Sequence, residues 1–155
     1  MTAHTPSIRY GKQDVDGINI FYREAGSTTS PAVLLMHGFP SSSHMFRGLI
    51  PPLARHFHVI APDLPGFGFS DAPSRSHFVY TFDHLTDVME RFTEAIGLAR
   101  YALYIFDYGA PVGLRLALRH PRTDHGHRVP KRERVRGRSQ RRLESDSTVL
   151  GNTQR

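Results

Sequence analysis

The sequence contains no cysteine and no tryptophan. A chain without cysteine cannot form disulfides, thiolate metal sites or a cysteine nucleophile. No apolar run approaches the ~20 residues that a helix needs to cross a bilayer, and the first ten residues lack the apolar core of a secretory signal. A length of 155 residues allows about one domain. We therefore expect a cytoplasmic protein with no membrane segment.

The net charge of +6 is distributed unevenly along the chain. Residues 1–120 hold ten basic and ten acidic residues, whereas residues 121–155 hold ten basic and four acidic ones. All 16 aromatic residues precede this second segment, which has only five hydrophobic residues. Such a segment cannot bury enough apolar surface to offset its ordering entropy. The sequence predicts a globular domain over residues 1–121 and a basic, disordered tail over residues 122–155.

Hydrophobic patterning predicts the strands and helices of that domain. Two alternating segments flank Asp16-Gly17, which is a strong signal for a β-hairpin. Three continuous apolar runs, at residues 32–36, 58–61 and 101–106, are typical of strands buried on both faces. Helical patterns separate the runs, and the clearest begins after an N-cap at Thr81 and ends at Gly97. Another helix is expected over roughly residues 109–119, so the order predicts an α/β sheet with parallel central strands.

A distinctive motif follows each of the three buried runs. These are HGFP at residues 37–40, DLPGFGFS at residues 63–70 and DYGAPVG at residues 107–113. Open α/β sheets bind ligands at the carboxyl ends of their strands. The three motifs therefore define the candidate functional site.

In this order and spacing the motifs resemble the α/β-hydrolase family, in the branch of epoxide hydrolases and haloalkane dehalogenases. The resemblance covers about residues 8–121. It implies a nucleophile on a sharp strand-to-helix turn and an oxyanion hole of backbone N–H groups. Carried onto this sequence, the nucleophile is Asp107, and the hole uses the N–H groups of Phe39 and Tyr108. The remaining HGFP residues are expected to support the loop: His37, Gly38 and Pro40.

The turn at Asp107 has suitable neighbours. A nucleophile on such a turn is crowded, and Gly109 and Ala110 are small, while Gly113 permits close packing of helix on strand. Ile105 stands where serine hydrolases favour glycine, which is a departure from the pattern.

An aspartate in place of serine changes the reaction class. A carboxylate is ionised at neutral pH and needs no base to activate it. It can displace a leaving group at a saturated carbon, and a histidine then activates water to cleave the resulting alkyl ester. The resemblance thus implies a small apolar epoxide or alkyl halide as substrate, with no cofactor. Dehalogenases of the family often hold the halide with a tryptophan after the nucleophile, where this chain has Tyr108, so we favour epoxide hydrolase over haloalkane dehalogenase.

Simpler roles exist for several of these residues. An aspartate at a strand end such as Asp107 is commonly a helix N-cap, and Asp63 is expected to organise its loop. A histidine such as His37 is ordinarily a candidate for acid–base catalysis, but the resemblance implies that it supports the HGFP loop instead. Gly66 and Gly68 could suggest a phosphate loop, but no Walker lysine accompanies them. Three further histidines could suggest a metal cluster: His120, His125 and His127. No set of carboxylates or cysteines accompanies them, so we expect no metal site there.

The family pattern is not recognisable beyond residue 121. A family member continues with further strands, a cap, an acid and the catalytic histidine, so we expect this chain to be truncated and inactive. One base inserted at the Pro121 codon explains the change, since the shifted frame can encode a family-like continuation containing ITAIV. The tail is then a frameshift product.

A function of another class is nucleic-acid binding through residues 131–142, KRERVRGRSQRR. Arginine-rich arms bind phosphates through counterion release. This arm lacks aromatic platforms, and residues 1–120 match no nucleic-acid-binding motif. We therefore expect no nucleic-acid partner.

Overall fold

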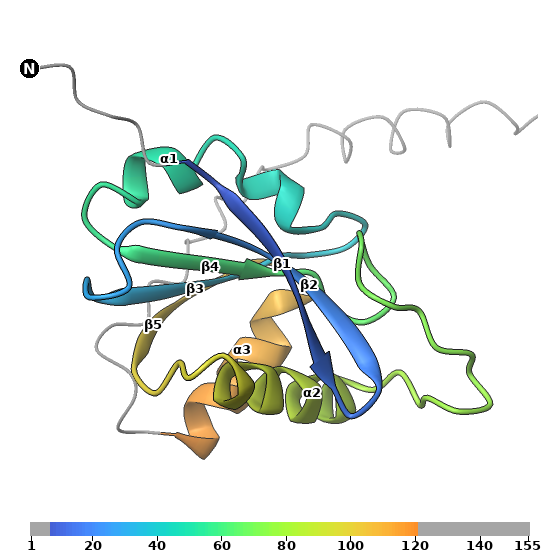
Figure 1. Ribbon diagram of the computed structural model, residues 1–155. Coiled ribbons are helices and arrows are strands. Elements are labelled where there is room, and N and C mark those ends of the chain that lie inside the picture. The colour runs from blue at the N-terminus through green and yellow to red at the C-terminus, as the bar shows by residue number, and fades with distance from the viewer. Residues whose placement is uncertain (1–6, 121–155) are drawn as a thin grey trace, which may run out of the picture.

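The computed structural model describes residues 7–120, which form one mixed five-stranded sheet (Figure 1). The strand order is β1-β2-β4-β3-β5. β1 pairs with β2 and β2 with β4 in antiparallel fashion, whereas β3 lies parallel to both β4 and β5. The predicted α/β sheet with parallel central strands is confirmed. The strands are β1 (Arg9–Val15), β2 (Ile18–Ala25), β3 (Ala32–Met36), β4 (His58–Pro62) and β5 (Tyr101–Ile105).

The hairpin turn falls at the predicted dipeptide. Val15 of β1 faces Ile18 of β2, and Asp16 and Gly17 between them have φ angles of 52° and 81°. Two successive residues with positive φ are what a two-residue type I′ turn requires, and Asp-Gly supplies them at low steric cost. The turn therefore fixes the register of the β1–β2 pair.

The two long helices also match the prediction. α2 (Phe82–Ala95) begins at Thr81, whose hydroxyl accepts a hydrogen bond from the His84 N–H, and Gly97 follows its end with a φ of 71°. α3 spans Gly109–Arg119. The helix expected between β3 and β4 is instead two short pieces, η1 (Ser43–Phe46) and α1 (Ile50–Leu53). The sequence IPPL of α1 includes two prolines, which lack the N–H that a longer helix needs.

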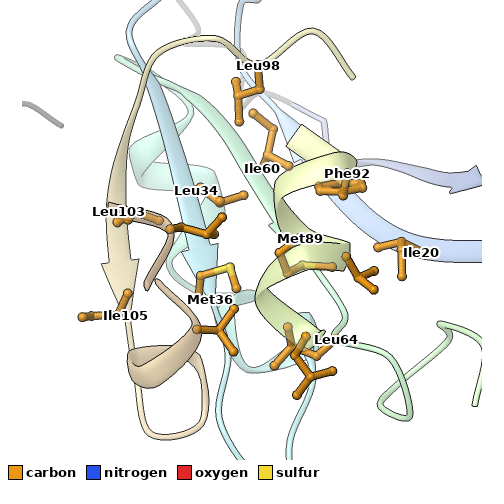
Figure 2. Packing of buried hydrophobic residues seen from close by; sticks show 14 of the residues in the cluster. Ile20, Leu34, Met36, Ile60, Leu64, Met89, Phe92, Leu98, Leu103 and Ile105 are labelled. Carbon is orange, nitrogen blue, oxygen red and sulfur yellow. The ribbon is translucent and has the colours of Figure 1, made fainter. Parts of the chain in front are cut away.

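Hydrophobic cores lie on both faces of the sheet. On one face, Leu34, Met36 and Ile60 pack against α2 and α3, as Figure 2 shows for Met89 and Phe92 of α2. On the other face a separate cluster joins η1 and α1 to the sheet: Leu35, Val59 and Ala61 with Phe46, Ile50 and Ala54. Burial on both faces explains why the central strands read as continuous apolar runs. No helix within residues 7–120 is long and apolar enough to span a membrane.

Candidate active site

The ends of β3 and β5 bring Asp107 against the HGFP loop. The backbone N–H groups of Phe39 and Tyr108 donate hydrogen bonds to the same carboxylate oxygen of Asp107, Oδ1, at 2.9 and 2.8 Å. Phe39 is 68 residues away in sequence, so the parallel β3–β5 pairing is what makes this contact. Two convergent N–H donors form a preorganised site for a developing negative charge on oxygen.

The backbone at Asp107 adopts a conformation that is rare for a residue with a side chain. Its φ is 48°, in the left-handed region, and the turn is closed by a hydrogen bond from the Gly109 N–H to the Phe106 carbonyl at 2.8 Å. Such a conformation costs about 1–3 kcal/mol and is concentrated at functional sites. α3 begins two residues later at Gly109, with Tyr108 as its N-cap and no capping side chain. Asp107 therefore does not serve as the cap of this helix.

Glycines allow the elements around Asp107 to approach closely. A Cβ on Gly38 would lie 2.4 Å from the Cβ of Asp107, and one on Gly109 would lie 2.5 Å from the Met36 carbonyl oxygen. A Cβ on Gly113 would likewise lie 2.4 Å from Cγ2 of Ile105. Because Gly113 has no side chain, α3 can pack directly over the side chain of Ile105. An isoleucine at the position where serine hydrolases favour glycine is therefore compatible with the turn.

Substituting Gly109 with alanine should destabilise the protein. The new methyl group would meet backbone carbonyl oxygens of β3 and its loop, which cannot move aside as a flexible side chain can. We expect Gly109→Ala to lower the free energy of unfolding by about 2 kcal/mol, measured by urea denaturation. Gly48→Ala is the matched control, because nothing lies within 4 Å of its Cβ position. Equal stabilities of the two variants would contradict the close approach.

His37 is fully buried and both of its ring nitrogens are engaged. The Leu64 N–H donates to Nε2 at 3.0 Å, so Nδ1 carries the hydrogen and donates to the Gly38 carbonyl at 3.1 Å. Burial lowers the pKa of His37 below its ordinary value, against opposing contributions from the Gly38 carbonyl and the Asp63 charge. A neutral imidazole in this position joins the HGFP loop to the loop after β4. Its nitrogens are not available to act as a general base in this arrangement.

The buried His37 should make stability depend on pH. Its pKa is lower in the folded state than the value of about 6.5 expected in the unfolded chain. The unfolded state therefore binds the additional proton, and stability is lost as the pH falls below about 6.5, by at most about 1.4 kcal/mol per pH unit. We expect this slope between pH 7 and pH 5.5 to be smaller in His37→Gln. Denaturation midpoints measured across that range test this, and parallel slopes in the two proteins would contradict it.

Asp63 organises two loops, in the way that the sequence suggested. Its buried carboxylate accepts hydrogen bonds from the N–H groups of Ser43 (2.6 Å) and Phe69 (2.9 Å). A Cβ on Gly68 would lie 2.0 Å from its Oδ2, which explains a glycine there. Arg23, which the sequence analysis did not single out, is also buried and donates from Nε to the Ser43 hydroxyl at 3.0 Å. These contacts tie β2 and β4 to the segment that follows the HGFP loop.

Aromatic rings surround the Asp107 turn. The Tyr108 ring lies 5.6 Å from Phe39, 6.3 Å from Phe67 and 5.3 Å from Phe82, measured between ring centroids. Phe39 is 60% exposed and Tyr108 41% exposed. The nucleophile candidate is therefore bordered by apolar surface that suits an uncharged substrate. Phe67 and Phe82 escaped sequence reasoning because nothing in their local pattern places them beside Tyr108.

The other candidate residues have simpler positions. The Phe39–Pro40 peptide bond is cis. His120 at the end of α3 contacts Glu90 of α2, and the part of the chain that is described contains no group of side chains suited to a metal ion. His125, His127 and the basic segment at residues 122–155, with its predicted frameshift and nucleic-acid arm, lie outside the described residues.

The chain is similar in sequence to curated hydrolases and in structure to solved ones. An uncharacterised hydrolase of Saccharomyces cerevisiae is 52% identical over 106 residues, 68% of this chain and 36% of that protein. A haloalkane dehalogenase of Mycobacterium marinum is 37% identical over 108 residues, 69% of this chain and 36% of that one. The solved structure of the Vigna radiata epoxide hydrolase mutant M263Q superposes with a TM-score of 0.68 at 32% identity, over 76% of this chain and 36% of its own.

Family membership follows from these matches. The chain spans about a third of the length of the curated relatives it matches. The family described as "alpha/beta hydrolase fold" matches residues 31–131, a range that contains the HGFP loop, the Asp63 loops and the Asp107 turn. The chain therefore belongs to the α/β hydrolase fold family.

Proposed function

We propose that Asp107 is the nucleophile of a hydrolase that acts through an alkyl-ester intermediate. The observation that carries this is the asymmetry of its carboxylate. Oδ1 accepts hydrogen bonds from both the Phe39 and Tyr108 N–H groups, whereas no hydrogen bond from residues 7–120 reaches Oδ2. One oxygen is thus held in place while the other is free to attack.

The proposed reaction has two steps. In the first, Oδ2 attacks a ring carbon of an epoxide, the carbon–oxygen bond of the ring breaks, and the ring oxygen leaves as an alkoxide that takes up a proton. In the second, water adds to the ester carbon, Cγ, and negative charge develops on Oδ1. The N–H groups of Phe39 and Tyr108 already point at that atom, so they stabilise this charge without reorganisation. The bond between Cγ and Oδ2 then breaks, and Oδ2 takes up a proton and leaves as the second hydroxyl of a diol. The oxygen of the added water, having lost its protons, stays on Cγ beside Oδ1 as the regenerated carboxylate.

The proposed substrate is a small apolar epoxide. Tyr108 follows the nucleophile, and the chain has no tryptophan with which to hold a departing halide ion. The aromatic border of Phe39, Phe67 and Tyr108 suits an apolar substituent on the epoxide. Haloalkane dehalogenase activity is the second candidate, favoured by the curated relatives of that name that are 34–38% identical.

Covalent labelling tests the proposed nucleophile. The chain is incubated with styrene oxide at neutral pH, and peptides are then sequenced by tandem mass spectrometry. We expect one added epoxide mass per chain, located on Asp107. A 1-bromoalkane of similar size, with bromide release as readout, separates the two candidate activities. An adduct confined to other residues would contradict the role of Asp107.

A further inference from the structure

β1 is an outer strand of the sheet, and part of its backbone faces no other strand. Among the described residues it pairs only with β2 (Figure 1). In a hairpin closed by a two-residue turn, the pair that flanks the turn is hydrogen-bonded, here Val15 with Ile18, and such pairs alternate with unbonded ones along the strands. The odd-numbered residues of β1 therefore direct their N–H and C=O groups to β2. Tyr10, Lys12 and Asp14 direct theirs to the free edge.

Hydrogen bonds on both strands agree with this alternation. The carbonyl of Phe21, which faces Lys12 across the hairpin, accepts a hydrogen bond from the Asp63 N–H at 2.8 Å and thus points away from β1. On β1, the Gln13 side-chain amide donates to the Asp14 carbonyl at 3.0 Å. No other hydrogen bond within residues 7–120 occupies the outward backbone groups of β1. A row of such groups can bind a further strand.

Two opposite charges stand on this edge without an ion-pair partner in the described part of the chain. Lys12 and Asp14 are two residues apart, so their side chains project from the same face of β1. Both are exposed, and neither takes part in an ion pair within residues 7–120, whereas Arg9 and Asp16 near the two ends of the strand are paired. A positive and a negative charge in this spacing are complementary to the same strand in the antiparallel direction.

The charges also select one register for such a pairing. A two-fold axis perpendicular to the sheet places β1 of a second copy antiparallel to the first and keeps equivalent faces together. With the axis at Gln13, Lys12 of each copy faces Asp14 of the other. An axis at Lys12 would place that ammonium opposite its own copy, and an axis at Gly11 would place it opposite Tyr10. Opposite charges across a strand pair stabilise it and like charges destabilise it, so the register centred on Gln13 is favoured.

We propose that β1 is a dimerisation strand, through which two copies of the chain pair antiparallel about Gln13. Lys12 and Asp14 form an ion pair on each side of the axis, and the two five-stranded sheets become one continuous sheet. A lysine on an edge strand ordinarily hinders sheet-to-sheet pairing. Here the second copy supplies the carboxylate that neutralises it. The surface concerned lies in the hairpin and takes no part in the reaction at Asp107.

Exchanging the two charges tests the proposal. Sedimentation velocity across a range of protein concentrations should show a species of twice the chain mass of 17.5 kDa and give its Kd. Lys12→Glu places two carboxylates opposite each other, and Asp14→Lys places two ammonium groups opposite each other. Each single change should raise Kd at least about tenfold, and the double variant should restore it to within about threefold of the parent. Arg75→Glu, which makes the same change of net charge in the exposed loop before α2, should leave Kd unchanged.

A cysteine at the proposed axis tests the register. The chain has no cysteine, so Gln13→Cys introduces a single thiol. Across the axis it would face its own copy in an unbonded pair with a Cα–Cα distance of about 4.5 Å, which a disulfide can span. With oxidised glutathione as the oxidant, we expect a covalent dimer on a non-reducing gel. Arg9→Cys lies on the same face of β1 but opposite Gly17 of the second copy, and should remain uncrosslinked.

Four results would overturn the proposal: a parent chain that sediments as a monomer at every concentration, a dimer whose Kd Lys12→Glu leaves unchanged, a double variant that binds no better than the single ones, and Gln13→Cys that does not crosslink. Circular dichroism checks that each variant is folded. This matters for Asp14, whose Oδ1 also accepts a hydrogen bond from the Gly17 N–H at 3.4 Å, whereas Lys12→Glu disturbs no such contact. Asp107→Asn should dimerise as the parent does, so a failure of epoxide labelling would contradict only the proposed function.

Discussion

Replacing Asp107 by asparagine should abolish covalent labelling of the chain by an epoxide. The neutral amide is too weak a nucleophile to attack the ring carbon, although it nearly matches the carboxylate in shape. The amide oxygen can still accept hydrogen bonds from the Phe39 and Tyr108 N–H groups, so the turn should persist. We expect the rate of adduct formation to fall by at least about a thousandfold, as is usual when a nucleophile is removed. Intact-protein mass spectrometry over time measures that rate.

The control for this experiment is Asp16→Asn. Among the described residues, Asp16 and Asp107 are the two residues other than glycine that have a positive φ. Asp16, like Asp107, carries an exposed carboxylate in a turn. Its carboxylate pairs with Arg91 and accepts no pair of backbone N–H groups. Labelling should therefore proceed as in the parent chain. Labelling that persists in Asp107→Asn, or that disappears in Asp16→Asn, would show that the paired N–H groups do not mark the nucleophile.

Repeated turnover of an epoxide is expected to need more than residues 7–120 provide. The 155-residue chain should form the ester and release less than one diol per chain, because no histidine within residues 7–120 is hydrogen-bonded to Asp107 to activate water. A positioned general base contributes about 10²–10⁴-fold to such a step. A chimera in which residues 1–120 are followed by the corresponding remainder of the Saccharomyces cerevisiae hydrolase adds the region of that relative that this chain does not match. We expect that chimera to turn over repeatedly.

Diol formation measured by chromatography distinguishes these results. A chimera carrying Asp107→Asn is the matched control and should be inactive. Repeated turnover by the 155-residue chain itself would contradict the need for an additional base. A fully active Asp107→Asn chimera would contradict the proposed mechanism as a whole.

Local signals in the sequence were sufficient for most of the fold. Asp16-Gly17 encodes its own turn, Thr81 and Gly97 mark the two ends of α2, and the central strands are apolar on both faces. The proximity of Asp107 to the HGFP loop also followed, because parallel strands bring their carboxyl ends to one edge. In each case the information lies within a few residues or in a simple topological rule.

Other features depend on packing between distant segments and could not be predicted. Arg23 reads as an ordinary charged residue of a hairpin strand, yet it is buried against Ser43 and lies over the Tyr10 ring. The rings of Phe67 and Phe82 meet at Tyr108 only because the loop after β4, the start of α2 and the turn after β5 converge. The exposure of Leu118 depends on what lies beside α3, which the helical pattern of α3 alone does not indicate.

A crystal structure of the chain after reaction with styrene oxide would test the role of Asp107 most directly. We expect the new bond at Oδ2, with the ester carbonyl oxygen Oδ1 still within about 3 Å of the N–H groups of Phe39 and Tyr108. That arrangement would show one oxygen attacking while the other is held for the second step. A bond to Oδ1, or an unmodified Asp107 beside an adduct on another residue, would contradict the assignment of Asp107 as the nucleophile.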